Sequence, residues 1–196
     1  MTEIRALTVF CGSRMGNDPA FRAAAEKFGD LLARDGITLV YGGGRVGLMG
    51  AIADRVMAGG GRAVGVIPDF LMEMEVGHGG VSELVRVPNM HTRKHIMFER
   101  SDGFVVLPGG LGTLEEAFEV ITWKQLHLHA KPIVLLDTNG YWQPFVQLAR
   151  ATVAGGFAHE RIHDLFSVVS EVEQILPALR AQPTPDRVVL DSHLIP

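Results

Sequence analysis

Residues 103–116 read GFVVLPGGLGTLEE, and their pattern is the clearest indication of the fold. It opens with Gly103–Leu107, an apolar run of the kind found in strands that are buried on both faces. Glycines and a proline follow at once, and Leu114–Gln125 then repeats apolar residues at helical spacing. A strand, a glycine-rich turn and a helix in this order make up the repeating unit of parallel α/β sheets.

The same alternation continues on both sides of this stretch, where short apolar runs are followed by longer amphipathic segments. We therefore predict an α/β fold with a Rossmann-like, doubly wound parallel sheet and helices on both faces. Further strands are expected at Leu7–Cys11, Ile37–Tyr41, Ala63–Ile67, Leu84–Val87 and Ile133–Leu136, further helices at Ala20–Arg34, Val46–Met57, Thr92–Glu99 and Trp142–Thr152, and a loop or short helix that covers a site at Asp69–Gly80.

The length and composition of the chain indicate an ordinary globular protein. The chain has 196 residues and no repeat or linker that would divide it, so we expect a single domain over residues 1–196. Its last part, residues 182–196, is expected to be an extended tail. Hydrophobic residues make up 47% and charged residues 20% of the chain, a balance that excludes a disordered or collagen-like protein.

Charge and cysteine content limit the partners and the compartment. The formal net charge of −4 offers no basic surface to nucleic acid, so nucleic acid is not an expected partner. No apolar window approaches the roughly 20 residues that span a membrane, and no membrane association is expected. The single cysteine, Cys11, cannot form an intramolecular disulfide, which favours a reducing, cytoplasmic location.

Small residues follow three of the predicted strands, at the edge where open parallel sheets bind ligands. The three segments are Gly12-Ser13, Gly42–Gly47 and Pro108–Thr113. Glycines let backbone N–H groups at a helix N-terminus approach an anion, so we expect a phosphate group there. The candidate ligand-binding residues of these loops are Gly12, Ser13, Gly43, Gly44, Gly109, Gly110, Gly112 and Thr113.

Two of these loops can be compared with known nucleotide-binding patterns. Gly42–Gly47 matches the dinucleotide-binding pattern G-x-G-x-x-G, but it follows the second strand and leaves the third loop without a role. Glycines there would also serve a tight turn and close helix packing. Pro108–Thr113 is the more specific phosphate cradle, and it lacks the lysine of the Walker A loop of NTPases.

Two interpretations of Thr113 and Glu116 stay open. Their spacing is that of a capping box, in which the threonine caps the helix and the glutamate bonds back to the cap. If a ligand phosphate takes those N–H groups instead, Glu116 faces the sugar beside it.

Residues 108–116 resemble the PGGxGTxxE motif of the Lonely Guy (LOG) family, the cytokinin riboside 5′-monophosphate phosphoribohydrolases, some of which were once misnamed lysine decarboxylases. Met90–Met97, which reads MHTRKHIM, is similar to the M-H-x-R-K-x-x-M segment of that family. The resemblance covers most of the chain. Many relatives carry glutamate where Thr92 stands, and we expect this departure to affect substrate preference rather than the chemistry.

The resemblance implies an enzyme that hydrolyses the N-glycosidic bond of a purine riboside 5′-monophosphate such as AMP, with no cofactor and no metal. Arg93 and Glu116 are then the catalytic pair. A carboxylate near C1′ stabilises an oxocarbenium-like sugar or activates water. The arginine holds the phosphate or ribose, or offsets charge on the leaving base, unless it is an ordinary surface arginine. Met90 and Lys94 are then substrate-binding residues.

Other interpretations concern the site and the assembly. A non-enzymatic nucleotide or molybdenum-cofactor carrier is the alternative function, because such carriers share a related glycine-rich fold, and a nicotinamide-dependent oxidoreductase is more distant. His91 and His95 have the i, i+4 spacing of a metal pair but lack a third ligand, so a structural role is favoured. The resemblance, together with the apolar Phe118, Ile121 and Trp123 on one helix, predicts a homodimer.

Overall fold

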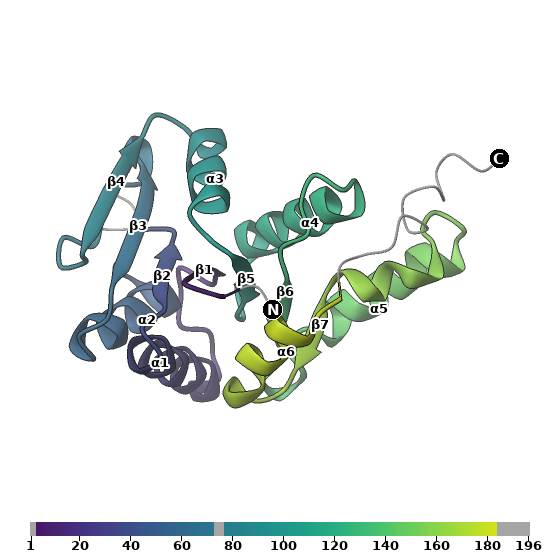
Figure 1. Cartoon of the computed structure of the whole chain (residues 1–196), viewed down its shortest axis with the longest axis horizontal. Helices are drawn as coiled ribbons and strands as arrows, with labels where there is room; N and C mark the ends of the chain where they lie inside the picture. The colour runs from purple at the N-terminus through teal and green to yellow at the C-terminus, as the bar shows by residue number, and fades with distance from the viewer. Residues whose placement is uncertain (1–2, 73–76, 184–196) are drawn as a thin grey trace.

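Short parallel strands form one sheet in the computed structural model, which describes residues 3–72 and 77–183 (Figure 1). The strands are β1 (Ala6–Phe10), β2 (Thr38–Tyr41), β3 (Ala63–Pro68), β4 (Glu83–Val87), β5 (Gly103–Val106), β6 (Ile133–Leu136) and β7 (Ser167–Val169). They lie in the order β4-β3-β2-β1-β5-β6-β7, and every neighbouring pair is parallel.

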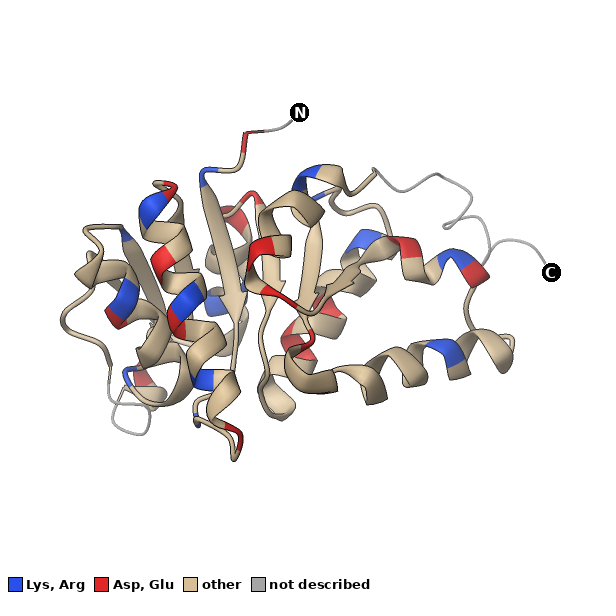
Figure 2. Cartoon of the chain, turned by 90° about the horizontal axis from the view of Figure 1, so that it is seen from below, with Lys and Arg blue, Asp and Glu red and all other residues tan. Residues whose placement is uncertain are grey.

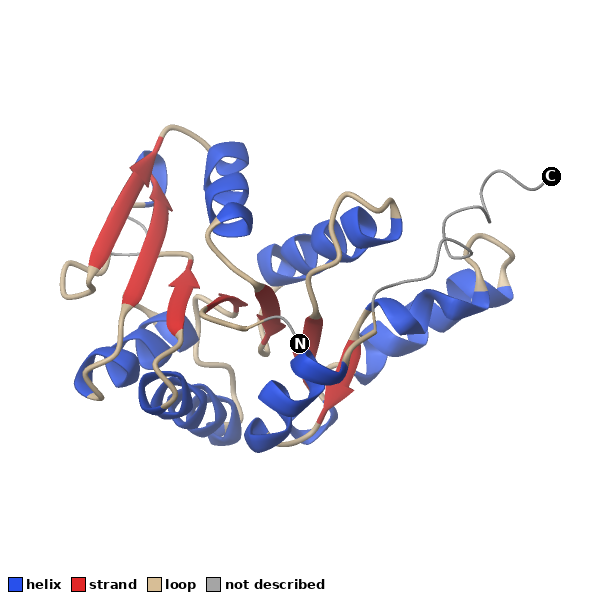
Figure 3. Ribbon diagram, in the orientation of Figure 1, coloured by secondary structure: helices blue, strands red, loops and turns tan. Residues whose placement is uncertain are grey.

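Helices cover both faces of this sheet (Figure 3). One face carries α1 (Pro19–Arg34), α2 (Gly47–Ala58) and α6 (Ile175–Ala181), and the other carries α3 (Met90–Glu99), α4 (Leu111–Gln125) and α5 (Gln143–Ala154). The predicted doubly wound α/β fold is confirmed, and the predicted elements from the first strand to the helix after β6 are all present.

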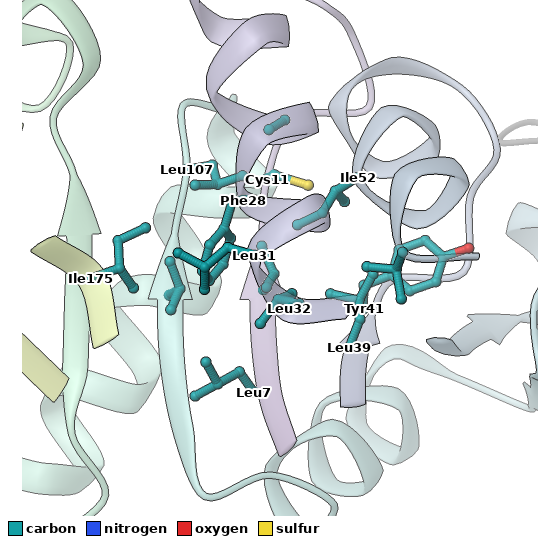
Figure 4. Packing of buried hydrophobic residues seen from close by; sticks show 14 of the residues in the cluster. Leu7, Cys11, Phe28, Leu31, Leu32, Leu39, Tyr41, Ile52, Leu107 and Ile175 are labelled. Carbon is teal, nitrogen blue, oxygen red and sulfur yellow. The ribbon is translucent and has the colours of Figure 1, made fainter. Parts of the chain in front are cut away.

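The strands are apolar on both sides because each lies between two layers of helices. Along β1, Leu7 and Val9 pack into the core under α1 and α2, whereas Phe10 packs into the core of the opposite face. Side chains that alternate along a strand therefore divide into two separate cores. Figure 4 shows the first core, to which Phe28 of α1 and Ile52 of α2 contribute.

The sequence prediction missed the C-terminal part of the sheet. β7 has three residues and α6 has seven with a proline in its first turn, so neither carries a long periodic pattern. Gln182 follows α6 in an extended conformation and bonds to both the N–H and the carbonyl of Ile133, at 2.8 and 3.1 Å. Residues 184–196, the rest of the predicted tail, lie outside the described residues.

The predicted loop at Asp69–Gly80 lies against the second glycine loop. It begins with a single 3-10 turn at Asp69–Leu71, and its residues 73–76 lie outside the described ranges. Gly77 pairs with Gly44 in an isolated bridge, and the His78 N–H donates to the Gly43 carbonyl at 2.9 Å.

Acidic and basic positions are interspersed along the helices in the view of Figure 2. Within residues 3–72 and 77–183, none of the helices combines the length and the apolar character needed to cross a membrane.

The direction in which the sheet is wound changes between β1 and β5. Successive strands run from β1 to β4 on one side of this point and from β5 to β7 on the other. The carboxyl ends of parallel strands share one edge, so the segments after β1 and β5 lie next to each other there. The Gly12 N–H donates to the Pro108 carbonyl at 3.0 Å. Two of the three predicted glycine loops therefore meet in one crevice.

Candidate active site

A pocket of about 190 Å³ lies beside the N-terminus of α4. Its walls come from the ends of β1 and β5 and from α2, α3 and α4. Among the predicted site residues it is lined by Gly12, Ser13, Met90, Arg93, Gly110, Gly112, Thr113 and Glu116, and it is also lined by Cys11, Met49 and Leu111. A larger pocket of about 520 Å³, which Gly109 lines, shares Gly12, Ser13, Gly110 and Leu111 with it.

The first turn of α4 presents backbone N–H groups to this pocket. Gly110 is the N-cap and has no side chain that could cap the helix. The first helical hydrogen bond runs from the Leu114 N–H to the Gly110 carbonyl at 3.0 Å. The N–H groups of Leu111, Gly112 and Thr113 thus have no partner within the helix. Because α4 begins at Leu111, Thr113 lies inside the helix and the capping-box interpretation of Glu116 is wrong.

The N-termini of the three preceding helices are capped from within the chain. Asp18 accepts from the N–H of Ala20 in α1, and Asn89 accepts from the N–H of Thr92 in α3. At α2, the N–H groups of Leu48 and Met49 both donate to the Gly12 carbonyl, at 3.0 and 3.4 Å. The N–H groups that begin α2 are therefore already bonded and do not fit the binding of a dinucleotide pyrophosphate, whereas α4 has no side-chain cap at its N-terminus.

Two glycines of the third loop are not required by the fold. A Cβ atom at Gly110 or Gly112 would meet no atom within 4 Å, and neither residue has a positive φ. Because these two residues have no side chain, a bound group can come close to the N–H groups of the turn. Gly109 differs, because a Cβ there would lie 2.2 Å from the Thr113 Oγ1 and 2.9 Å from the Gly12 nitrogen.

Arg93 of α3 and Glu116 of α4 face each other in the pocket. Both are buried, with 5% and 7% of their surface exposed, and Nη2 of Arg93 lies 3.9 Å from Oε1 of Glu116. Nη1 of Arg93 contacts the Sδ of Met90 at 3.6 Å, and Nε has no hydrogen-bond partner among the described residues. A surface role for Arg93 is therefore wrong. Burying two charges is costly, and it is typical of functional sites.

Gly42 makes room for the Arg93 guanidinium, a role that sequence reasoning missed. A Cβ atom at Gly42 would lie 2.0 Å from Nη2 of Arg93. The run of three glycines directly after β2 was a signal, but it predicted ligand contacts at Gly43 and Gly44 instead.

Gly43 and Gly44 do not line either pocket beside α4. Gly43 has a φ of +79°, and a Cβ there would lie 3.0 Å from Ile67 and 3.2 Å from Leu84. Its role is a tight turn against β3 and β4, and Gly44 pairs with Gly77. These packing roles account for both glycines, and their assignment as substrate-binding residues stays a prediction that neither pocket supports.

Lys94 is also placed outside both pockets. Its Nζ bonds to Glu115 at 2.5 Å and to Glu119 at 2.9 Å, so its side chain lies across α4 rather than toward a ligand. Burial opposes the charged form of Lys94, but the hydrogen bonds to the two carboxylates outweigh it and raise its pKa. Lys94 thus joins α3 to α4 and fixes the helix that carries Arg93.

The two histidines of α3 do not form a metal site. His91 and His95 are exposed on the helix surface. In the part of the chain that the structure describes, no three His, Cys, Asp or Glu side chains are grouped so that they could hold a metal ion.

Comparison with known sequences places these residues in a recognised family. Residues 49–179 match the model of a family described as possible lysine decarboxylase. The chain is 44% identical over 183 residues to a probable cytokinin riboside 5′-monophosphate phosphoribohydrolase, LOGL9, of Oryza sativa subsp. japonica, covering 90% of this chain and 81% of the relative. It is 42% identical over 178 residues to a cytokinin riboside 5′-monophosphate phosphoribohydrolase of Rhodococcoides fascians, covering 90% of each.

Comparison with solved structures adds evidence on the fold alone. The molybdenum cofactor binding protein of Rippkaea orientalis matches with a TM-score of 0.69 at 20% identity, over 92% of this chain and 98% of that chain. The Moco carrier protein of Chlamydomonas reinhardtii matches with a TM-score of 0.68 at 21% identity, over 91% of this chain and 96% of that chain.

Proposed function

Because this chain belongs to the Lonely Guy (LOG) family of cytokinin riboside 5′-monophosphate phosphoribohydrolases, we propose that it hydrolyses the N-glycosidic bond of a purine riboside 5′-monophosphate. The products are the free base and ribose 5-phosphate. The observation that carries the proposal is the uncapped N-terminus of α4 in one pocket with the buried pair Arg93 and Glu116.

The first turn of α4 is the proposed phosphate site. The N–H groups of residues 111–113 and the positive end of the helix dipole favour a dianion. Gly110 and Gly112 put no side chain in its way. A phosphate held there anchors the end of the ribose opposite the scissile bond, so that binding energy far from the reaction contributes to the chemistry.

Glu116 is the proposed catalytic carboxylate. It lies one turn, about 5.4 Å, beyond the phosphate site on the same helix, and in the proposed complex the ribose spans that interval. As the bond between C1′ and the base nitrogen breaks, the carboxylate stabilises the cationic sugar or takes a proton from the attacking water. The water oxygen bonds to C1′, and the base leaves with the bonding electron pair and gains a proton.

Arg93 is the proposed partner of Glu116. Its planar guanidinium orients the carboxylate and has further N–H groups for the ribose or the leaving base. Met90 lies against the guanidinium and contributes an apolar wall to the pocket.

The test is incubation of the protein with AMP, with free adenine and ribose 5-phosphate as the measured products. Adenosine at the same concentration is the matched control, and we expect its initial rate to be at least about 10²-fold lower because it cannot use the phosphate site. Inorganic phosphate and ribose 5-phosphate should inhibit. Comparable rates for AMP and adenosine would indicate a plain nucleosidase, and binding of AMP without release of adenine would favour a nucleotide carrier.

We also propose that the protein is a homodimer in the cytoplasm. Of the three apolar residues that suggested a dimer, Ile121 is buried within the chain and Trp123 packs edge-on against Phe98. The third, Phe118, is exposed, and further support comes from other exposed apolar side chains on and near α4 and α5, namely Leu111, Leu126, Leu148 and Phe157. Cys11, the single cysteine, is consistent with a reducing compartment.

A further inference from the structure

We propose that Tyr141 is a positioning residue whose hydroxyl group orients the phosphate cradle and thereby sets the affinity of the site for a 5′-phosphate. The inference rests on the proposed function only because it assumes that the substrate carries a phosphate monoester.

The Tyr141 hydroxyl donates a hydrogen bond to the Gly109 carbonyl at 2.6 Å, across 32 positions of sequence. Gly109 directly precedes Gly110, the N-cap of α4. Tyr141 also lines the larger pocket together with Gly109 and Gly110. A side chain from the segment after β6 thus holds the backbone at the point where the cradle begins.

The geometry of the peptide bond turns this contact into control of a donor. The peptide between Gly109 and Gly110 is trans, and in a planar trans peptide the carbonyl and the N–H point in opposite directions. Fixing the Gly109 carbonyl therefore fixes the direction of the Gly110 N–H, which directly precedes the donors of Leu111, Gly112 and Thr113 and belongs to a residue that lines both pockets. A hydrogen bond accepted by the carbonyl also polarises the amide and strengthens its N–H as a donor.

This part of the loop needs an external anchor because it is made of glycines. Glycine has the least restricted backbone dihedral angles of all residues, so the peptide between Gly109 and Gly110 can rotate at little steric cost. The preceding carbonyl, of Pro108, is held by the Gly12 N–H at 3.0 Å. Tyr141 holds the next carbonyl, and the two bonds together define the path of the loop into α4.

The ring of Tyr141 is held independently of its hydroxyl. It makes edge contacts with Phe21 and Trp142, at centroid distances of 5.2 and 5.0 Å. The turn before it has positive φ at Asn139, whose side chain donates to Asp18 at 2.8 Å. Replacing the tyrosine by phenylalanine should therefore keep the ring in place and remove only the hydrogen bond.

The chain offers a matched control, because it contains only two tyrosines. The hydroxyl of the other, Tyr41, is buried and has no hydrogen-bond partner among the described residues. Tyr141→Phe and Tyr41→Phe therefore both delete a hydroxyl oxygen. The first hydroxyl bonds to the cradle, and the second lies in the core between the sheet and the helices α1 and α2. Thermal melting of both variants checks that each is folded.

The measurement is the affinity for AMP and for adenosine, by calorimetry or competition, with each tyrosine variant combined with Glu116→Gln to prevent turnover. We expect Tyr141→Phe to lower the ratio of AMP affinity to adenosine affinity by about 5- to 10-fold, the effect of one hydrogen bond, and Tyr41→Phe to leave it unchanged. With Glu116 present, kcat/KM for AMP should fall by the same factor.

An unchanged ratio in Tyr141→Phe, an equal loss for AMP and adenosine, or an equal effect of both tyrosine variants would overturn the inference. The proposed function fails by a different result, namely the absence of adenine release from AMP by the unmodified protein. If the unmodified protein bound AMP without turnover, the hydrolase would be refuted, and a lower ratio of AMP to adenosine affinity in Tyr141→Phe would still support the role of Tyr141.

Discussion

Gly42 leaves open the space that the Arg93 guanidinium occupies. A methyl group there would lie 2.0 Å from Nη2 of Arg93. The atom it meets is the far end of a flexible side chain, so Gly42→Ala should move the guanidinium and leave the fold in place. We expect turnover of AMP to fall at least about 10-fold, because charge stabilisation depends on position. Steady-state kinetics with thermal melting checks this.

The control for Gly42→Ala is Gly79→Ala, since a Cβ atom at Gly79 would meet nothing within 4 Å. This variant should match the unmodified protein in both measurements. If Gly42→Ala also matched it, Arg93 would not depend on the space at Gly42.

Glu116 and Glu115 are adjacent acids with different surroundings. Glu116 is buried beside Arg93, whereas the exposed Glu115 bonds to Lys94. We expect Glu116→Gln to keep the fold and to lower the turnover of AMP by at least about 10²-fold, the effect of losing a positioned carboxylate. Glu115→Gln should matter much less, because its side chain points about 100° away around α4. Near-normal adenine release by Glu116→Gln would remove Glu116 from the mechanism.

Two helices meet at the site, and Lys94 fixes their relative position. Its ion pairs with Glu115 and Glu119 join α3 to α4. Lys94→Met removes these ion pairs and puts an uncharged side chain of similar length in place of the lysine. We expect a loss of about 1 kcal/mol in the free energy of unfolding and a lower kcat, with KM for AMP little changed. Urea unfolding and steady-state kinetics measure these quantities.

Lys27→Met is the control for Lys94→Met, since it breaks an exposed ion pair with Glu173 on the other face of the sheet. It should leave kcat unchanged. A large rise in KM for Lys94→Met, with stability and kcat unchanged, would instead assign Lys94 to the substrate.

The connection from α4 to β6 contains a histidine that should make stability depend on pH. Burial lowers the pKa of His129 to about 4, against the influence of its hydrogen bond to the Val120 carbonyl. The unfolded chain, with an ordinary histidine pKa near 6.5, therefore binds more protons between about pH 4 and 6.5. The contribution of His129 to stability is present above this window and is lost as the pH falls through it.

We expect His129 to account for about 1–2 kcal/mol of this loss, after allowance for its partial exposure. The measurement is the free energy of unfolding of the protein and of His129→Gln between pH 5 and 7.5. The variant should show a smaller pH dependence, and the exposed His95→Gln serves as the control. Equal slopes for His129→Gln and the unmodified protein would contradict the prediction.

The assembly of the whole molecule should depend on the apolar surface of α4 and α5. Leu148 of α5 is 53% exposed, and Leu111 and Phe118 of α4 are exposed as well. We expect light scattering at micromolar concentration to give twice the 21.3 kDa of one chain, and Leu148→Glu to weaken the dimer. Gln147→Glu, at the exposed neighbouring position, should not. A monomer mass for the unmodified protein would exclude the dimer at that concentration.

Local patterns in the sequence were sufficient for the architecture. Apolar runs, amphipathic segments and the glycine loops between them are properties of neighbouring residues, so the strands from β1 to β6 and the helices from α1 to α5 were predicted. The short β7 and α6 were missed because their stability comes from packing and from Gln182, not from a periodic pattern.

The fold class followed from the sequence pattern, which also marked Pro108–Thr113 as a predicted phosphate loop and, through the family resemblance, Arg93 and Glu116 as a predicted catalytic pair. Which residues contact and position that pair depends on the three-dimensional fold. Gly42 rather than Gly43 faces Arg93, Lys94 turns to α4, and Tyr141 reaches Gly109. These contacts join different strands and helices, so their geometry is set by the way the sheet brings the carboxyl ends of its strands together.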